Sequence, residues 1–240
     1  MVVKSELKLI KSLHQKKYRT QHGLFIVEGI KAVEEVLNSD FEVYKIFAST
    51  PIASNVLTDM VTLISTREIA QMSSLTNPNG ILGVFRIPEP KKVDTNDWIL
   101  VLDGVQDPGN MGTIIRLCDW FGIQHLVCSE HTVDCYNPKV LQATMGSITR
   151  VNTVYLDLAE FLQSVQLPIY GSFMNGTSIS QTKLPEKGVL VMGNEGKGIS
   201  ERIKEFCEHT IAIPQYGSKT AESLNVATAS AILLSEIRRD

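Results

Sequence analysis

The chain is 240 residues long, which is enough for one large domain or two small ones. Hydrophobic residues make up 43% and charged residues 20%, an ordinary globular composition, and the net charge of −3 gives no overall sign of nucleic-acid binding. No apolar run approaches the ~18 residues of a membrane span, and the polar N-terminus holds no secretory segment. We therefore expect a cytoplasmic protein that does not enter a membrane.

The residues before position 88 predict a small α/β domain. Short apolar runs bounded by polar residues indicate strands, and apolar residues at helical spacing indicate helices between them. The expected strands are Leu24–Val27, Val43–Phe47, Val61–Ile64 and Ile81–Ile87, and the expected helices are Ile30–Leu37 and Arg67–Met72.

A basic cluster opens this domain. Its six cations are opposed only by Glu6, and they are Lys4, Lys8, Lys11, Lys16, Lys17 and Arg19. The first three recur at i, i+4 and i+7, so on a helix they share one face. Such a face is either a solvated helix surface or a patch that contacts the phosphates of a nucleic acid, and the sequence leaves both interpretations open.

A linker follows at residues 88–97, where two prolines and five charged residues leave little to bury. We expect one domain over residues 1–92 and a second over 96–240. In the second, apolar runs alternate with helical patterns, which predicts an α/β fold with a mostly parallel sheet and helices on both faces. The expected strands are Trp98–Leu102, His125–Cys128, Val151–Tyr155, Ile169–Phe173, Val189–Met192 and His209–Ile213, and the expected helices are Asn110–Phe121 and Ser223–Ile237.

Three polar, glycine-bearing segments each follow one of these strands, where ligands bind in open α/β sheets. They are 103–116, 191–200 and 213–231. Taken singly, Asn110 reads as a helix cap and Arg116 as a surface arginine, while Glu222 or Ser223 would cap the last helix. The second segment matches neither the P-loop nor the dinucleotide-binding pattern. The scattered cysteines and histidines indicate reduced thiols and no metal site.

Together, the three segments resemble the SpoU (TrmH-like) family of RNA ribose 2′-O-methyltransferases, in the SPOUT superfamily. The motifs that carry the resemblance, in the family's order, are Asp107–Arg116, Gly193–Gly198 and Glu222–Val226. A looser resemblance to the family's substrate-binding domain rests on Lys16–Arg19 and Gly23–Gly29.

The resemblance implies a trefoil-knotted methyltransferase domain, a homodimer, and S-adenosylmethionine as cofactor. The catalytic group it implies is Asn110, Arg116, Glu195, Ser223 and Asn225. The cofactor contacts it implies are Gly193, Asn194, Gly196, Ile213 and Leu224. The substrate would be structured RNA, either ribosomal or transfer RNA, with ribosomal RNA favoured. The six cations of the basic cluster would be its RNA contacts.

The implied reaction is attack of a ribose 2′-oxygen on the cofactor's methyl group, which requires the hydroxyl to lose its proton. The family's mechanism makes Arg116 the base. Arginine keeps its proton, however, so we expect Arg116 to orient the hydroxyl and stabilise charge, while the neighbouring phosphate or water accepts the proton and Glu195 holds Arg116 or a neighbour. Two alternatives stay open. One is a non-catalytic RNA-binding protein that retains the fold, and the other is a SPOUT enzyme that modifies a base, against which the Ser223–Asn225 segment argues.

Overall fold

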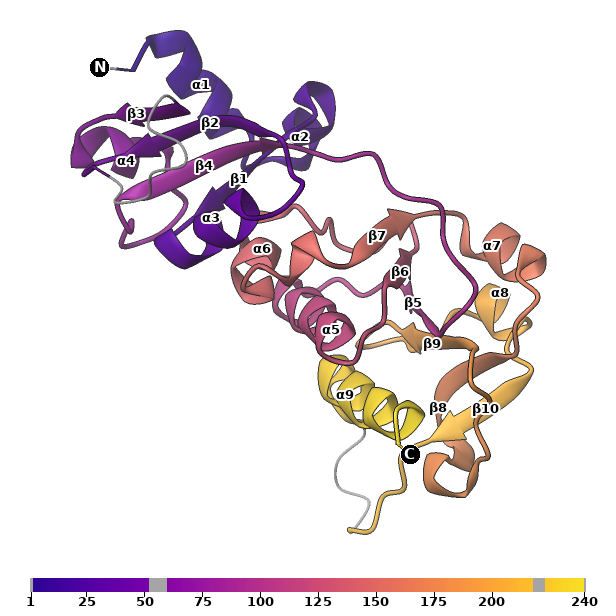
Figure 1. Cartoon of the computed structure of the whole chain (residues 1–240). Coiled ribbons are helices and arrows are strands. Elements are labelled where there is room, and N and C mark those ends of the chain that lie inside the picture. Colours follow the sequence, from indigo (N-terminus) through magenta and orange to yellow (C-terminus); the bar gives the residue numbers. More distant parts are fainter. Residues whose placement is uncertain (1, 52–59, 218–222, 240) are drawn as a thin grey trace. The chain divides into compact units, whose positions relative to one another are not determined.

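The structure is a computed structural model that describes residues 2–51, 60–217 and 223–239. The chain forms two compact units (Figure 1). Unit 1 comprises residues 1–89 and 134–149, and unit 2 comprises residues 90–133 and 150–240. The sequence-based boundary near residue 92 did not anticipate that residues 134–149, which lie in the second half of the chain, cluster with the first.

Unit 1 holds a four-stranded sheet in the order β1-β4-β2-β3. Its strands are β1 (Leu24–Glu28), β2 (Val43–Ala48), β3 (Val61–Leu63) and β4 (Ile81–Arg86), and its helices are α1 (Lys4–Ser12), α2 (Lys16–His22), α3 (Ile30–Leu37), α4 (Thr66–Met72) and α6 (Pro138–Thr144). The pairs β1–β4 and β2–β4 are antiparallel, and β2–β3 is parallel. The predicted strands are confirmed to within a residue or two.

Helix α1 docks on this sheet through its apolar side. Ile10 and Leu13 are buried with Ile26, Phe47 and Met72 in one core cluster. The lysines of α1 lie on the opposite side and are exposed. The predicted two-faced helix is therefore present, because burying the apolar stripe leaves the basic stripe in solvent.

Unit 2 is built on a six-stranded sheet in the order β10-β8-β9-β5-β6-β7, and every neighbouring pair is parallel. The strands are β5 (Ile99–Asp103), β6 (His125–Cys128), β7 (Asn152–Tyr155), β8 (Ile169–Ser178), β9 (Val189–Gly193) and β10 (His209–Ala212). The helices are α5 (Pro108–Trp120), α7 (Leu158–Ser164), α8 (Glu201–Lys204) and α9 (Val226–Ile237). The predicted parallel α/β fold is confirmed.

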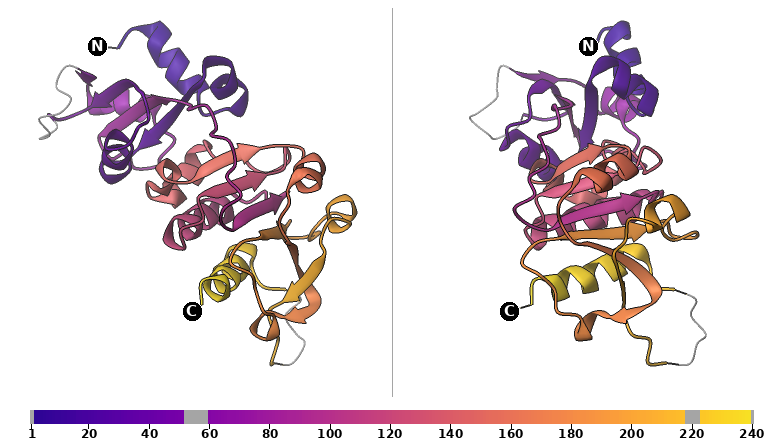
Figure 2. Two further views of the ribbon diagram at one scale, coloured as in Figure 1. Left: turned by 45° about the vertical axis from the view of Figure 1, so that its right-hand side comes forward. Right: turned by 90° about the vertical axis from the view of Figure 1, so that its right-hand side faces the viewer.

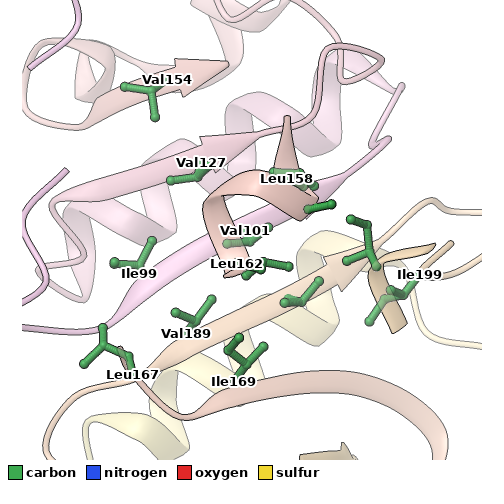
Figure 3. Packing of buried hydrophobic residues seen from close by; sticks show 13 residues of the cluster. Ile99, Val101, Val127, Val154, Leu158, Leu162, Leu167, Ile169, Val189 and Ile199 are labelled. Carbon is green, nitrogen blue, oxygen red and sulfur yellow. The ribbon is translucent and has the colours of Figure 1, made fainter. Parts of the chain in front are cut away.

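Helices cover both faces of this sheet (Figures 1 and 2). On one face, Leu158 and Leu162 of α7 and Ile203 of α8 pack against Val101 and Val189 (Figure 3). Helices α5 and α9 pack together and contact β6 and β9. Because successive side chains of a strand point to opposite faces, the central strands are buried on both sides and read as continuous apolar runs.

Both helices that frame the proposed site begin elsewhere than the sequence predicted. Helix α5 is capped by Asp107, whose carboxylate accepts the Asn110 N–H at 2.8 Å, so Asn110 is not its cap. Proline at the next position suits the first helical turn. Helix α9 is capped by Asn225, which leaves Ser223 outside the helix, and Glu222 lies outside the described residues.

Candidate active site

The three motif segments converge at the carboxyl ends of β5 and β9. These strands are parallel neighbours, and their last paired residues are Asp103 and Gly193. The chain continues from β5 to β6 on one side and from β9 to β10 on the other side of the sheet. The strand order therefore reverses between β5 and β9, and such a switch point is where open α/β sheets bind ligands.

Glu195 joins the first two segments. Its carboxylate accepts hydrogen bonds from the backbone N–H of Gln106 at 3.2 Å, the backbone N–H of Asp107 at 3.1 Å and the Asn110 amide at 3.1 Å. Burial disfavours the charged form of Glu195, but the hydrogen bonds from Asn110, Asp107 and Gln106 outweigh it and hold the pKa of Glu195 below its usual value. The carboxylate therefore stays ionised and fixes the start of α5.

Asn110 links this hub to the third segment. Its side-chain oxygen accepts a hydrogen bond from the Asn225 amide at 2.8 Å. The Asn225 oxygen in turn accepts the backbone N–H groups of Ala227 and Thr228 at the start of α9. Three of the five predicted catalytic residues, Glu195, Asn110 and Asn225, thus form one hydrogen-bonded chain.

The other two predicted catalytic residues stand apart from that chain. Arg116 is exposed in the third turn of α5, and Ser223 is exposed before α9. Neither side chain forms a hydrogen bond or ion pair with another residue in the described part of the chain. We expected Glu195 to hold either Arg116 or a residue near it. In the structure, Glu195 accepts a hydrogen bond from Asn110 and does not contact Arg116.

The loop after β9 is shaped by Asn194. Its amide donates to the Gly104 carbonyl at 2.7 Å, and its oxygen accepts the N–H groups of Gly196 and Lys197 at 3.0 Å. Gly193 is required by the loop itself, since a Cβ there would lie 2.1 Å from the Gly198 carbonyl carbon. The side chain of Asn194 thus holds the shape of the loop, and its backbone N–H and carbonyl groups also close the loop by bonding Gly198 at 2.9 Å.

The basic cluster of unit 1 is only partly available for RNA. Lys4, Lys8, Lys11, Lys16 and Lys17 are exposed.

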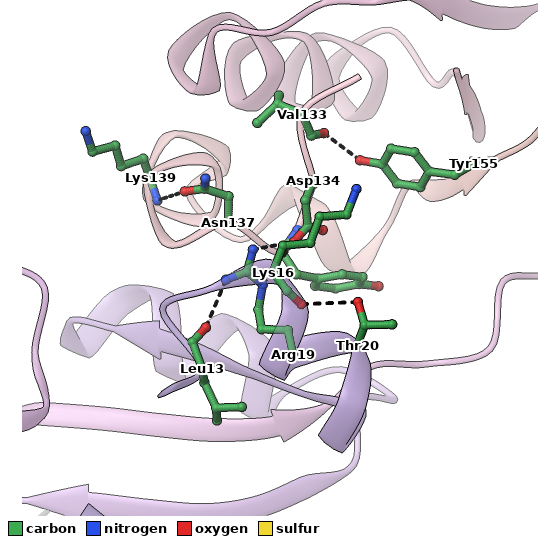
Figure 4. A network of polar contacts seen from close by, with 10 residues as sticks. Leu13, Lys16, Arg19, Thr20, Val133, Asp134, Asn137, Lys139 and Tyr155 are labelled. Carbon is green, nitrogen blue, oxygen red and sulfur yellow. Dashed lines mark hydrogen bonds and ion pairs between the residues drawn. The ribbon is translucent and has the colours of Figure 1, made fainter. Parts of the chain in front are cut away.

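The prediction that Arg19 contacts RNA is wrong, because the structure buries this residue to 2% exposure. Its guanidinium donates from Nε to Asp134 at 2.9 Å, pairs with the same oxygen through Nη2, and donates from Nη1 to the Leu13 carbonyl at 2.9 Å (Figure 4). A guanidinium whose donors are used inside the protein cannot reach a phosphate. Its partner lies 115 positions away, so no local pattern in the sequence could indicate the pair.

Sequence reasoning also missed residues that support the site. Asp107 both caps α5 and offers its N–H to Glu195, and the Asp-Pro pair before a helix was the available signal. Ser129 and Thr132, which bond the Gly104 N–H, carry no recognisable pattern. Across residues 2–51, 60–217 and 223–239, no group of three histidine, cysteine, aspartate or glutamate residues is placed to hold a metal ion, and no helix could cross a membrane.

Comparison with known proteins decides the family. Residues 97–235 match the model of the SpoU rRNA Methylase family, and residues 4–83 match the MRM3-like substrate binding domain. The chain belongs to the SpoU rRNA methylase family. The 23S rRNA (guanosine(2553)-2′-O)-methyltransferase RlmP of Bacillus subtilis is 34% identical to it, over 95% of this chain and 94% of that protein.

Solved structures of SpoU-type proteins share the fold over the whole chain. A TrmH-family protein from Porphyromonas gingivalis superposes with a TM-score of 0.87 at 35% identity, covering 99% of this chain and 98% of that one. An AdoMet-bound rRNA methyltransferase from Sinorhizobium meliloti gives a TM-score of 0.86 at 26% identity, covering 99% and 96%. The resemblance drawn from the three motifs is therefore confirmed, both for the family and for the α/β fold.

The residues of this SpoU-family site fit an adenosine-containing cofactor. Such a ligand needs apolar contacts for its base and backbone groups for its polar edges. Leu224 is 51% exposed, and its backbone forms no hydrogen bond with any described residue. Gly196 is exposed, and a Cβ there would meet nothing closer than 3.7 Å. The segment before α9 thus presents an apolar side chain together with backbone groups that no described residue bonds, and the Gly196 position leaves room beside the β9 loop.

Proposed function

We propose that this protein methylates a ribose 2′-hydroxyl of ribosomal RNA with S-adenosylmethionine as methyl donor. The observation that carries the proposal is the hydrogen-bonded chain Glu195–Asn110–Asn225, which draws the three family motifs to one strand end. Relatives named 23S rRNA 2′-O-methyltransferases support ribosomal over transfer RNA. Such a substrate favours a cytoplasmic location.

The bound cofactor would supply an electrophilic methyl group. Gly193, Asn194, Gly196, Ile213 and Leu224 would bind it through backbone groups and the exposed leucine. This is an assignment by position, supported by Leu224, which is 51% exposed and whose backbone forms no hydrogen bond with any described residue. The trefoil knot that the family implies remains a prediction for this chain.

The protein's own side chains would bind and orient the ribose. Asn110 and Asn225 are fixed by their mutual hydrogen bond and by Glu195, so the second N–H donor of each side-chain amide is held in place for a ligand. The Arg116 guanidinium, exposed on the same helix as Asn110, would orient the 2′-hydroxyl and stabilise charge near the phosphate. Ser223 would supply a hydroxyl beside the cofactor site.

We also propose that the protein acts as a homodimer. Helices α5 and α9 pack together, and they leave Trp120 84% and Ile232 37% exposed. A second copy covering this face would remove both apolar side chains from water. Trp120→Glu should then shift the sedimentation of the full chain from dimer to monomer, whereas a wild-type monomer would refute the assignment.

Incubation with S-adenosylmethionine carrying a radiolabelled methyl group tests the reaction. Purified protein should label unmodified 23S ribosomal RNA at one ribose, and a transcript with a 2′-deoxyribose at that nucleotide should take up no label. Requiring the 2′-hydroxyl is what separates RNA from DNA substrates. RNA binding without cofactor binding in calorimetry would instead favour a non-catalytic RNA-binding protein.

A further inference from the structure

Two buried hydroxyl side chains lie directly behind the proposed site. Ser129 is 9% exposed and Thr132 is 2% exposed, and both follow β6. Buried polar groups away from water need hydrogen-bond partners, so each such group has a structural or functional reason. Here both hydroxyls are directed at the turn that follows β5.

The hydrogen bonds of this pair are complete. The Gly104 N–H is shared between Ser129 Oγ at 3.0 Å and Thr132 Oγ1 at 3.2 Å. Thr132 Oγ1 donates to the Leu102 carbonyl at 3.1 Å, which leaves it to accept the Ser129 proton across 3.0 Å. Both hydroxyl protons thus have an acceptor: Ser129 donates to Thr132, and Thr132 donates to the Leu102 carbonyl.

The turn they hold is the one that the site uses. Gly104 has a φ of +76°, a conformation that glycine adopts without steric cost. Its carbonyl accepts the Asn194 amide at 2.7 Å, and Asn194 precedes Glu195. The turn also leads into Gln106 and Asp107, whose N–H groups bind Glu195.

We propose that Ser129 and Thr132 are positioning residues for methyl transfer: by fixing Gly104, they set the Asn194–Glu195 loop against the start of α5. The inference rests on the proposed methyltransferase function. Neither hydroxyl needs to touch RNA or cofactor. They act through Gly104 on the groups that do, and a displacement of about 1 Å in such groups can cost ~10²-fold in rate.

The test compares three variants of the full chain. Thr132→Val keeps the shape and removes the hydroxyl, and it should lower kcat on ribosomal RNA by about tenfold to a hundredfold. Thr132→Ser restores the hydroxyl and should return kcat to within about threefold of wild type. Thr144→Val is the matched control, because Thr144 is fully buried in unit 1 and bonds only locally to the Leu141 carbonyl at 2.8 Å.

A merely structural role would make Thr132→Val and Thr144→Val alike, with lower unfolding temperatures and unchanged kcat, and that result would overturn the proposal. The side-chain amide NMR signals of Asn194 and Asn110 give a readout that needs no activity. They should move in Thr132→Val and not in Thr144→Val.

If the wild-type protein labels no RNA, the proposed function fails, and the amide signals still decide the positioning role. Unmoved signals refute it. Should Thr132→Val fold poorly, Ser129→Ala removes only the outer hydroxyl and is held to the same criteria.

Discussion

Replacing Glu195 by glutamine tests the hub of the site. The two carboxylate oxygens divide their partners: one accepts Asp107 N–H and the Asn110 amide, and the other accepts Gln106 N–H and, at 3.4 Å, the Asn194 amide. A glutamine has one acceptor oxygen. If that oxygen keeps Asp107 and Asn110, its NH₂ group faces the Gln106 N–H at about the present 3.2 Å, and two donors oppose each other.

The expected loss of stability is modest. Hydrogen bonds to charged groups contribute ~1.5–3 kcal/mol in favourable cases, but Glu195 lies at the surface, where solvent reduces the value, so we expect about 1 kcal/mol. The effect on catalysis should be larger, because the same change releases Asn110 and through it Asn225. A loss of ~10²-fold or more in kcat is expected for misplaced site groups.

The pH dependence gives the sharper criterion. The pKa of Glu195 is lower in the folded protein than in the unfolded chain, where it lies near ~4.3. The stabilisation is therefore fully present above the unfolded value and is lost as pH falls through the folded value. Urea unfolding of wild type and Glu195→Gln should differ at pH 7 and converge at low pH.

Glu201→Gln serves as control for that measurement. Glu201 is an exposed residue of α8 whose carboxylate, among the described residues, pairs with Lys204 alone, at 3.6 Å, and the loss of its charge should change neither kcat nor stability measurably. Equal differences between wild type and Glu195→Gln at pH 7 and at low pH would refute the reasoning, since the carboxylate charge would then have no part in holding the loop.

Two further predictions concern exposed cations. Arg116→Ala should lower kcat by ~10²–10⁴-fold while the unfolding temperature and cofactor affinity stay near wild type, because the Arg116 side chain bonds no other described residue; turnover within a few-fold of wild type would contradict its role. The triple variant of Lys4, Lys8 and Lys11 to glutamine should make the slope of log RNA affinity against log salt shallower by about 0.7–0.9 per lysine that contacts phosphate. If the plots for wild type and the triple variant have the same slope, the lysines of α1 contact no phosphate and form only a solvated surface.

The sequence predicted the sheet of unit 2 well, because a strand buried on both faces has to be a continuous apolar run. It placed helix starts less well. Asn110 and Ser223 are both good capping residues by type, yet Asp107 and Asn225 cap the helices instead. Capping depends on which side chain can turn back to the first free N–H groups, and residue type alone does not fix that.

The sequence motifs that form the site could be predicted, but the hydrogen bonds between their side chains could not. The three segments were found because each follows a strand. That Glu195 would bond Asn110 and two backbone amides, and not Arg116, depends on how two loops approach each other. Short helices such as α6 and α8, with seven and four residues, have too few turns to show a periodic pattern.

The ion pair of Arg19 and Asp134 provides a last prediction, in which a basic residue of the N-terminal cluster behaves unlike its neighbours. The two side chains are 3% and 14% exposed, and Asp134 belongs to the segment 134–149 that clusters with unit 1. Removing one partner of a buried pair leaves an uncompensated charge and costs ~3–5 kcal/mol. Asp134→Asn and Arg19→Met should each lower the free energy of unfolding by about that amount in urea titrations.

The double variant, Arg19→Met with Asp134→Asn, should lose much less than the sum of the two, because it leaves no unpaired charge in the interior. Additive losses would mean that the two residues do not act as a pair. Arg19→Met, measured at a temperature where it stays folded, should also leave the salt dependence of RNA binding parallel to wild type, since its guanidinium bonds Asp134 and the Leu13 carbonyl and is not available to phosphate. A slope shallower by 0.7–0.9 would instead return Arg19 to the RNA-binding surface with the exposed lysines.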